Sequence, residues 1–279
     1  MINVFYSEDF YNGKMSGPKK VMDNLIRSLS DCNIEYVVNE ERYDKTLFLH
    51  WNPKFVNLYH SLKNKKNLLV GPQIWAWSEE FNELKEYNKV LLPSKWCEDS
   101  LNKFFPQTKT GVWPVAIYEP EIIDDVKTDC LVYYKNRPEE DLQLVLDYLE
   151  NNNISYTGLQ YGNYTQQEFL ESVGEVKYCI IIDNTESQGI AIEEMMAANK
   201  PIFVWDQLIW DHLGQDYSVS ATSIPYWSEE CGERIETFDS FDETFKMFLE
   251  KLDSYSPRQY VNRELSPQKS IDILLSLFE

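Results

Sequence analysis

Several features of common protein classes are missing from this sequence. Its five cysteines form no C-x-x-C pair and it has only three histidines, so neither a disulfide framework nor a zinc site is indicated. No apolar run approaches the ~20 residues that span a bilayer. The N-terminus, MINVFYSEDF, lacks the cationic start and apolar core of a signal peptide, which favours a reducing, cytoplasmic setting. Cys97, Cys130 and Cys179 lie in or beside apolar runs and are expected in the core.

Positive charge is also scarce. The chain of 279 residues has 46 acidic and 26 basic residues, which gives a formal net charge of -20. A surface with this excess repels phosphate backbones and anionic lipids, so nucleic acids and membranes are not expected as partners. A nucleotide-sized ligand stays possible because it needs only a local positive site. Nothing in the composition indicates an oligomeric state.

Short β-branched and aromatic runs alternate with longer stretches of helical period, which predicts an α/β protein with parallel sheets. The run MINVFY is the first expected strand, and an amphipathic helix is expected over residues 16–31. The expected apolar face of this helix consists of Val21, Leu25, Ile26 and Leu29. Further helices are expected over residues 53–63 and 95–104.

The segment from Val115 to Asp129 contains Pro120 and several acids with little periodicity, which predicts a linker. The alternation then resumes. Strands are expected at CLVYY, ISYTGLQYG, YCIIID and PIFVWD, and helices at EEDLQLVLDYLENN, TQQEFLESVGEV, IAIEEMMAAN, FDETFKMFLEKL and PQKSIDILLSLFE. We therefore expect two Rossmann-like domains, residues 1–120 and 121–279, with the last helix able to pack back on the first domain.

The stretch from residue 184 to 206, NTESQGIAIEEMMAANKPIFVWD, carries the strongest chemical signal. A polar loop follows an expected strand, and a helix is expected to open near Gly189 and to end at a left-handed Asn199. Free N–H groups and the positive end of the helix dipole make such a loop a site for a diphosphate. Glu186 in the loop can reach sugar hydroxyls, and Glu194 in the helix can hold a ribose diol. For two glutamates alone, a plain strand–loop–helix with solvated surface charges is the favoured interpretation.

The whole string resembles the E-x7-E signature of retaining GT-B glycosyltransferases, the glycogen-synthase-like, family 4-like group. The family form is an E-[GS]-x-G-[LI] loop, three variable positions and E-A-M-A-x-G-x-P. This sequence has E-S-Q-G-I and then E-M-M-A-A-N-K-P, with Met195 and Asn199 in place of Ala and Gly. The resemblance covers most of the chain from about Ser94 to Leu252 and is patchy before that. It implies a GT-B fold, in which two Rossmann-like domains face a central cleft.

The resemblance also implies a donor site. Glu186 would position the sugar and Glu194 the ribose, while the neighbouring Glu193 is expected at the surface. The residues expected to bind the donor in the loop and the first helical turn are Ser187, Gln188, Gly189 and Ile190.

Two cations are expected to stabilise the leaving diphosphate. In CLVYYKNRPEEDL, Arg137 matches the family's arginine, but the family's lysine is absent at Leu142, and Lys135 is the candidate substitute. Surface charges at a strand end are the alternative interpretation. LQYGNY matches a family strand end beside the nucleotide base, so the residues expected to shape that pocket are Tyr161, Gly162 and Tyr164. Tyrosines at such a place are otherwise core residues.

The first half adds three candidate residues. S-G-P-K-K-V looks like a family turn at which Gly17 lets the backbone approach the donor phosphates and Lys19 adds charge. His50 ends an expected strand, as does a family histidine that lines the cleft, and it joins Glu186, Arg137 and Lys135 as a catalytic candidate. An ordinary strand–helix turn and a structural histidine are the alternatives. The tryptophans of GPQIWAWSEEF, Trp75 and Trp77, are candidates for a sugar-stacking wall or for the core.

The function implied by the resemblance is transfer of a sugar, with retention of anomeric configuration, from a UDP- or GDP-type donor to a glycan or other hydroxyl acceptor. No metal and no cofactor is expected. The missing lysine leaves a degenerate nucleotide- or glycan-binding protein open, and a nucleotide-sugar epimerase shares the same build. A single-domain, metal-dependent glycosyltransferase is disfavoured because no strand ends in D-x-D. A Rossmann dehydrogenase is disfavoured because no G-x-G-x-x-G follows the first strand.

Overall fold

The computed structural model describes residues 1–7, 16–40, 45–50, 67–73, 89–211 and 218–278. The chain divides into two compact units, one of Met1–Ala116 with Leu265–Glu279 and one of Ile117–Glu264. The helix expected over 53–63 and the tryptophans Trp75 and Trp77 lie outside the described residues.

The first unit is built on a six-stranded sheet with the order β2-β1-β3-β4-β5-β6. All of its described pairings are parallel. The strands are β1 (Ile2–Phe5), β2 (Tyr36–Val38), β3 (Thr46–His50), β4 (Leu68–Gln73), β5 (Lys89–Leu92) and β6 (Thr110–Val112). The strands β1, β3 and β4 are buried over almost their whole length, as expected for central strands covered on both faces.

Three described helices belong to the first unit: α2 (Gly17–Asp31), α4 (Lys95–Phe104) and α10 (Pro267–Leu277). The helices expected over 16–31 and 95–104 are thereby confirmed. Ser28 lies on the buried face of α2 and donates to the backbone carbonyl of Asn24 at 2.6 Å, whereas Ile26 is only half-buried. The hydroxyl stays buried because this bond satisfies it.

The second unit has a five-stranded parallel sheet with the order β13-β10-β9-β7-β8. Its strands are β7 (Thr128–Lys135), β8 (Tyr156–Gln160), β9 (Val176–Asp183), β10 (Ile202–Trp205) and β13 (Gly232–Ile235). A small antiparallel pair, β11 (Ile209–Asp211) with β12 (Ser218–Ser220), follows β10. The two parallel sheets confirm the predicted α/β class.

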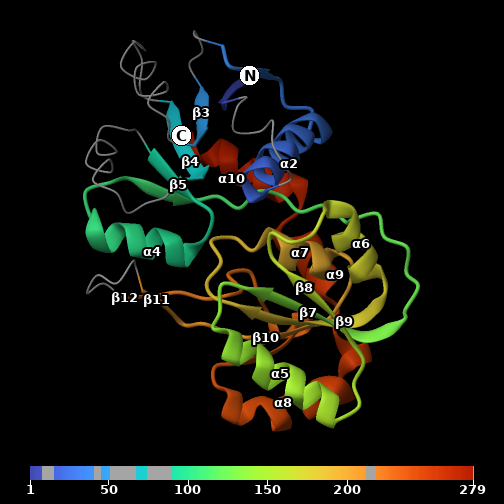
Figure 1. Ribbon diagram of the computed structural model, residues 1–279. Coiled ribbons are helices and arrows are strands. Elements are labelled where there is room, and N and C mark those ends of the chain that lie inside the picture. The colour runs from blue at the N-terminus through green and yellow to red at the C-terminus, as the bar shows by residue number, and fades with distance from the viewer. Residues whose placement is uncertain (8–15, 41–44, 51–66, 74–88, 212–217, 279) are drawn as a thin grey trace. The chain divides into compact units, whose positions relative to one another are not determined.

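Helices cover both faces of this second sheet. They are α5 (Glu139–Asn151), α6 (Gln166–Gly174), α7 (Ile190–Ala197), α8 (Phe241–Glu250) and α9 (Pro257–Glu264). Figure 1 shows α5 and α8 beneath the sheet and α6, α7 and α9 above it. Phe203 of β10 packs edge-on against Phe241 and Phe245 of α8, with ring centroids 5.0 Å apart in both pairs.

The segment between the two sheets has no regular structure from residue 113 to 127. The predicted linker reached two residues too far, because Thr128 and Asp129 already belong to β7. The start of this segment is not exposed, since Trp113, Val115 and Ala116 are fully buried. Among the described residues, no helix is both long enough and apolar enough to cross a bilayer.

Candidate functional site

The site begins where the strand order of the second sheet reverses. The chain passes from β7 to β8 on one side, then crosses back to β9 on the other side of β7. Open parallel sheets bind their ligands beyond the carboxyl ends of the strands at such a switch point. Lys135 ends β7 and Asp183 ends β9, and the two residues are register partners. They therefore mark the expected place of a ligand.

Gly189 determines how the helix α7 opens beside these strand ends. Its backbone has φ 92° and ψ 38°, in the left-handed region, and it is the N-cap residue of the helix. A Cβ atom here would meet side-chain atoms of Glu186 and Pro225 only at 3.6–3.8 Å, which is ordinary contact. The conformation, and not the space, therefore requires glycine at this position. As a glycine, the N-cap residue has no side chain that could accept a hydrogen bond from the first helical turn.

The far end of α7 has the predicted cap. Asn199 has φ 61°. Its N–H donates to Met196 at 2.9 Å, and the N–H of Lys200 donates to Met195 at 3.0 Å. This pair of bonds is the Schellman arrangement, in which the left-handed residue ends the helix. The length of α7 is thus fixed at both ends by residues that the sequence pattern identified.

Lys135 forms an ion pair with Glu186. Both side chains are only 14% exposed, and the ammonium also lies 4.5 Å from the centre of the Tyr161 ring. Burial alone would lower the pKa of Lys135, but the charges of Glu186 and Asp183 outweigh it and raise the pKa. The lysine is therefore charged at neutral pH and lies beside the loop glutamate.

Arg137 lies at the same strand ends and is also enclosed. Its Nε donates to Asp141 at 2.8 Å, and its Nη1 lies 3.1 Å from Gln207 Oε1 and 3.4 Å from the carbonyl of Asp183. The guanidinium stacks over Trp205 at 4.7 Å. Its side chain is 6% exposed. The interpretation of Lys135 and Arg137 as surface charges is wrong, because both are largely buried.

Asp183 is a further titratable group of the site, and the sequence analysis did not identify it. Its side chain is fully buried, and Oδ1 accepts a hydrogen bond from the N–H of Asn184 at 2.7 Å. Burial, and then the negative charge of Glu186, raise the pKa of Asp183 to about 9. The sequence feature that could have identified Asp183 is its position: it is the last residue of an apolar strand and directly precedes the loop.

The two glutamates of α7 differ in burial. Glu193 was expected at the surface, but it is only 2% exposed, and its Oε2 accepts a hydrogen bond from Gln188 Nε2 at 3.0 Å. This expectation was wrong because the α7 segment is apolar on almost all sides and is therefore buried around most of its circumference. Glu194 is half-buried at the next position, and Ser187 in the loop is exposed.

The residues after β8 lie beside Lys135. Tyr161 is 47% exposed, and Gly162 has φ 84° with open space around it. Tyr164 is half-buried: its hydroxyl lies 3.4 Å from that of Tyr133, and its ring stacks on Phe169 at 5.8 Å. Tyr164 thus has the partners of a core residue, whereas Tyr161 presents a ring to solvent.

A second loop, which the sequence analysis missed, braces the first. The hydroxyl of Ser223 donates to the backbone carbonyls of Asp183, at 3.0 Å, and of Asn184. The N–H of Glu186 donates to the carbonyl of Thr222 at 3.0 Å. Asp206, at the end of β10, accepts from the N–H of Ser223 at 2.6 Å. These bonds hold the backbone of the Glu186 loop, and no sequence motif pointed to them.

The candidate residues of the first unit lie at α2 and β3. Gly17 is the first residue of α2, and an added Cβ would meet nothing within 4 Å. Lys19 pairs with Asp23 at 2.9 Å, one helical turn away. His50 is the last residue of β3 and is 4% exposed, and burial lowers its pKa to about 4. The imidazole is therefore uncharged at neutral pH.

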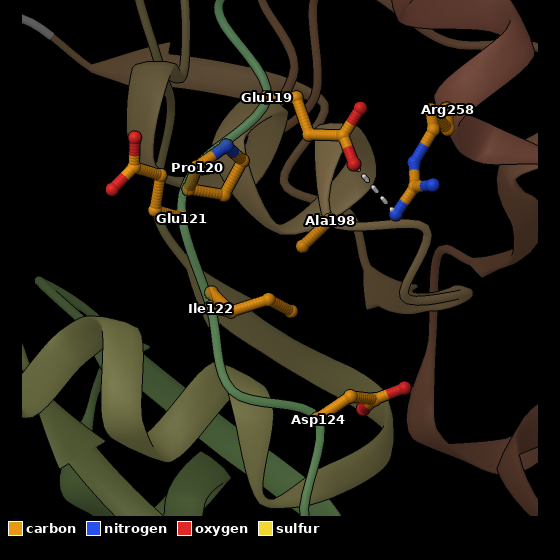
Figure 2. A pocket seen from close by; sticks show the side chains of 7 residues that line it. All are labelled: Glu119, Pro120, Glu121, Ile122, Asp124, Ala198 and Arg258. Carbon is orange, nitrogen blue, oxygen red and sulfur yellow. Dashed lines mark ion pairs between the residues drawn. The ribbon is translucent and has the colours of Figure 1, made fainter.

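A separate hollow of about 570 Å³ lies at the other end of α7. Figure 2 shows its lining residues, Glu119, Pro120, Glu121, Ile122, Asp124, Ala198 and Arg258. Arg258 pairs with Glu119 at 3.1 Å and donates to the carbonyl of Ala197 at 2.9 Å. The buried ammonium of Lys200 pairs with Asp124 at 2.7 Å. Both cations, Arg258 and Lys200, are therefore already paired with groups of the protein itself.

Comparison with known proteins shows the fold. No protein-family model matches the sequence, and no curated protein is similar to it in sequence. Among solved structures, the lipopolysaccharide outer core galactosyltransferase WaaB matches with a TM-score of 0.61 and 10% identity over 99% of both chains. Sucrose-phosphate synthase from Thermosynechococcus elongatus matches with a TM-score of 0.58 and 10% identity, over 99% of this chain and 96% of that one.

A third structure, S. aureus TarM in complex with Fondaparinux, alpha-GlcNAc-glycerol and UDP, has a TM-score of 0.57 and 12% identity. The match covers 91% of this chain but only 58% of the TarM chain. At identities this low, the likeness concerns the fold. The chain therefore has the GT-B fold of these glycosyltransferases, with one parallel α/β sheet in each of its two units.

Proposed function

We propose that this chain is a glycosyltransferase that transfers a sugar from a nucleotide diphosphate donor to a hydroxyl acceptor with retention of anomeric configuration. The observation that carries this proposal is the cluster at the switch point of the second sheet. There, Lys135, Arg137, Glu186 and the N-terminus of α7 gather within one unit. The GT-B fold of the structures compared above supports it.

The cations and the helix N-terminus suit the donor diphosphate. Cleavage of the bond between the anomeric carbon and the phosphate oxygen leaves negative charge on the diphosphate. Lys135, Arg137 and the N–H groups after Gly189 would stabilise that charge as it develops. Since two cations and a helix end supply the positive charge, we propose that the reaction needs neither a metal nor a cofactor.

The carboxylates suit hydroxyl groups. Glu186 would accept hydrogen bonds from the sugar, and Glu194 from the ribose. The acceptor oxygen would bond to the anomeric carbon on the face that the diphosphate leaves, and its proton would pass to the departing phosphate oxygen. A glycan or another hydroxyl compound can serve as this acceptor. Donor contacts are also proposed for a wider set: Ser187, Gln188, Ile190, Tyr161, Gly162, Tyr164, Gly17 and Lys19.

UDP is the first nucleotide to test, because TarM was solved with UDP and alpha-GlcNAc-glycerol and its chain has the same fold. The thermal midpoint of the protein would be followed with UDP, GDP and ADP and with their sugar forms. A ligand at 100 times its Kd stabilises the folded state by about 2.7 kcal/mol. We expect one nucleotide family to raise the midpoint, and Glu194→Ala, which removes the ribose acceptor, to weaken that effect by about tenfold in Kd.

Turnover then separates the candidate reactions. Release of the nucleoside diphosphate only when a hydroxyl acceptor is present supports transfer, and the anomeric configuration of the product, read by NMR, tests retention. Conversion of the donor without an acceptor would indicate an epimerase. Binding without any turnover would indicate a degenerate binding protein. No response to any nucleotide would contradict the donor site itself.

A further inference from the structure

Asp183 is a buried acid beside the cations of the proposed site, and no step of the proposed reaction uses it. Its Oδ1 is held by the N–H of Asn184 at 2.7 Å. Its Oδ2 lies 3.9 Å from the ammonium of Lys135 and accepts no hydrogen bond from the part of the chain that the structure describes. A fully buried carboxylate oxygen without a hydrogen-bond donor is costly, so this atom requires an explanation.

A proton on Oδ2 provides that explanation. A protonated carboxyl group is a donor, and Glu186, whose carboxylate faces Asp183, is an acceptor for it. The charges agree with this assignment. With Asp183 uncharged, the cluster of Lys135, Glu186 and Asp183 is neutral, whereas ionised Asp183 would leave it with a net negative charge in a buried place.

We infer that Asp183 is an uncharged acid that positions Lys135 and Glu186 for the donor diphosphate. This inference rests on the proposed function. Lys135 has two fixed neighbours, Asp183 and the ring of Tyr161, and one exchangeable partner, Glu186. When the ammonium of Lys135 pairs with a diphosphate, the carboxylate of Glu186 is released to bind the sugar. Asp183 and the ring of Tyr161 then keep Lys135 at the strand end.

The uncharged state matters for binding because an ionised Asp183 would compete with the diphosphate for Lys135 and would repel it. The titratable and charged groups that face Asp183 within the second unit are Lys135, Glu186, Tyr133 and Arg137. The pKa of Lys135 is raised although burial alone would lower it, and burial raises the pKa of Tyr133. The pKa of Asp183, at about 9, lies within the range from pH 7.5 to 9.5.

The test is the pH dependence of nucleotide binding by isothermal titration calorimetry, with UDP, GDP and ADP as probes. If only the protonated form binds, the apparent Kd rises by about fourfold between pH 7.5 and pH 9.5. Asp183→Asn keeps the shape and removes the ionisation. We expect the ratio of the Kd at pH 9.5 to the Kd at pH 7.5 to be about four in the wild type and close to one in this variant.

A matched control lies on the same two strands at their other end. Asp129 of β7 pairs with Lys177 of β9 at 2.7 Å, and this pair lowers the pKa of Asp129 to about 2. Asp129→Asn should keep the wild-type ratio. If the ratio of the two Kd values is the same in Asp183→Asn as in the wild type, the role inferred for Asp183 is wrong. The proposed donor site is not contradicted by that result. If no probe binds the wild type at pH 7.5, the proposed function fails, and this inference fails with it.

A measurement without nucleotide checks the protonation directly. In protein labelled with 13C at aspartate carboxyl groups, one resonance should titrate above pH 7 and be missing from Asp183→Asn. Titration of the Asp183 resonance near pH 4 would overturn the inference even if nucleotides bind.

Discussion

Glu193 precedes the proposed ribose-binding glutamate by one residue, yet its environment is that of a core side chain. It is 2% exposed, and α7 packs there against α9. Its Oε2 is bonded to Gln188, while Oε1 has no hydrogen-bond partner among the described residues. Burial raises the pKa of Glu193 well above its ordinary value, because the charged form is poorly solvated there.

This environment predicts the effect of Glu193→Gln on stability. A carboxyl group with a raised pKa in the folded state stabilises the fold at low pH and loses that contribution as the pH rises towards the folded-state pKa. Glutamine keeps the shape without the charge. We expect Glu193→Gln to raise the thermal midpoint above that of the wild type at pH 8 by roughly 2–4 °C, and the difference to shrink towards pH 4.5.

Glu243→Gln is the control for this effect, because Glu243 is an exposed residue of α8. It should change the midpoint little at any pH. A wild-type midpoint that runs parallel to that of Glu193→Gln across the whole pH range would contradict the burial of an acid at this position.

At the scale of elements, the turn into α7 depends on the backbone of Gly189. Its left-handed conformation costs a residue with a Cβ atom about 1–2 kcal/mol, although the space around it is sufficient. We expect Gly189→Ala to lower the free energy of unfolding, measured in urea, by about that amount. The altered loop should also weaken nucleotide binding, because the N–H groups after Gly189 would be displaced.

Gly158 is a matched control for Gly189. It lies in β8, with nothing within 4 Å of an added Cβ, and its φ is not in the left-handed region. Gly158→Ala should change the free energy of unfolding by about 0.5 kcal/mol or less. Equal effects of the two substitutions would mean that conformation does not determine the turn.

Elements with a strong local pattern were predictable from the sequence, and elements with a weak one were not. The helix α7 was predicted from Gly189 and Asn199, since both of its ends depend on local backbone conformation. The helix α9 was missed because the short, polar segment P-R-Q-Y-V-N-R-E buries only Pro257, Tyr260 and Val261, and its packing partners lie elsewhere in the chain. The burial of Glu193 had a signal, because a helix that is apolar on almost all sides is a buried one.

At the scale of the whole molecule, the alternation of strands and helices was enough to predict two parallel sheets, but not their strand order. The order follows from crossovers between distant segments, such as the return from β8 across β7 to β9. The bracing of the Glu186 loop by Thr222 and Ser223 depends on the same long-range packing. The same long-range packing brings Lys135 next to Asp183. The sequence alone left undecided whether Lys135 replaces the family lysine that is missing at Leu142.

The net charge of -20 makes Lys135 the critical residue of the proposed function. An anionic nucleotide is repelled by most of such a surface and binds only where local cations offset it. The most direct test is therefore calorimetric titration of UDP, GDP and ADP into the wild type, Lys135→Gln and Lys177→Gln. Lys177 is the control, because it is a half-exposed lysine that pairs with Asp129 at the other end of the same strands.

A charge-assisted bond to phosphate contributes about 1.5–3 kcal/mol. We therefore predict that Lys135→Gln weakens binding of the preferred nucleotide by roughly 10- to 150-fold, while Lys177→Gln leaves it within about twofold. Equal binding by the wild type and Lys135→Gln would contradict the claim that the donor diphosphate binds at the carboxyl ends of β7 and β9.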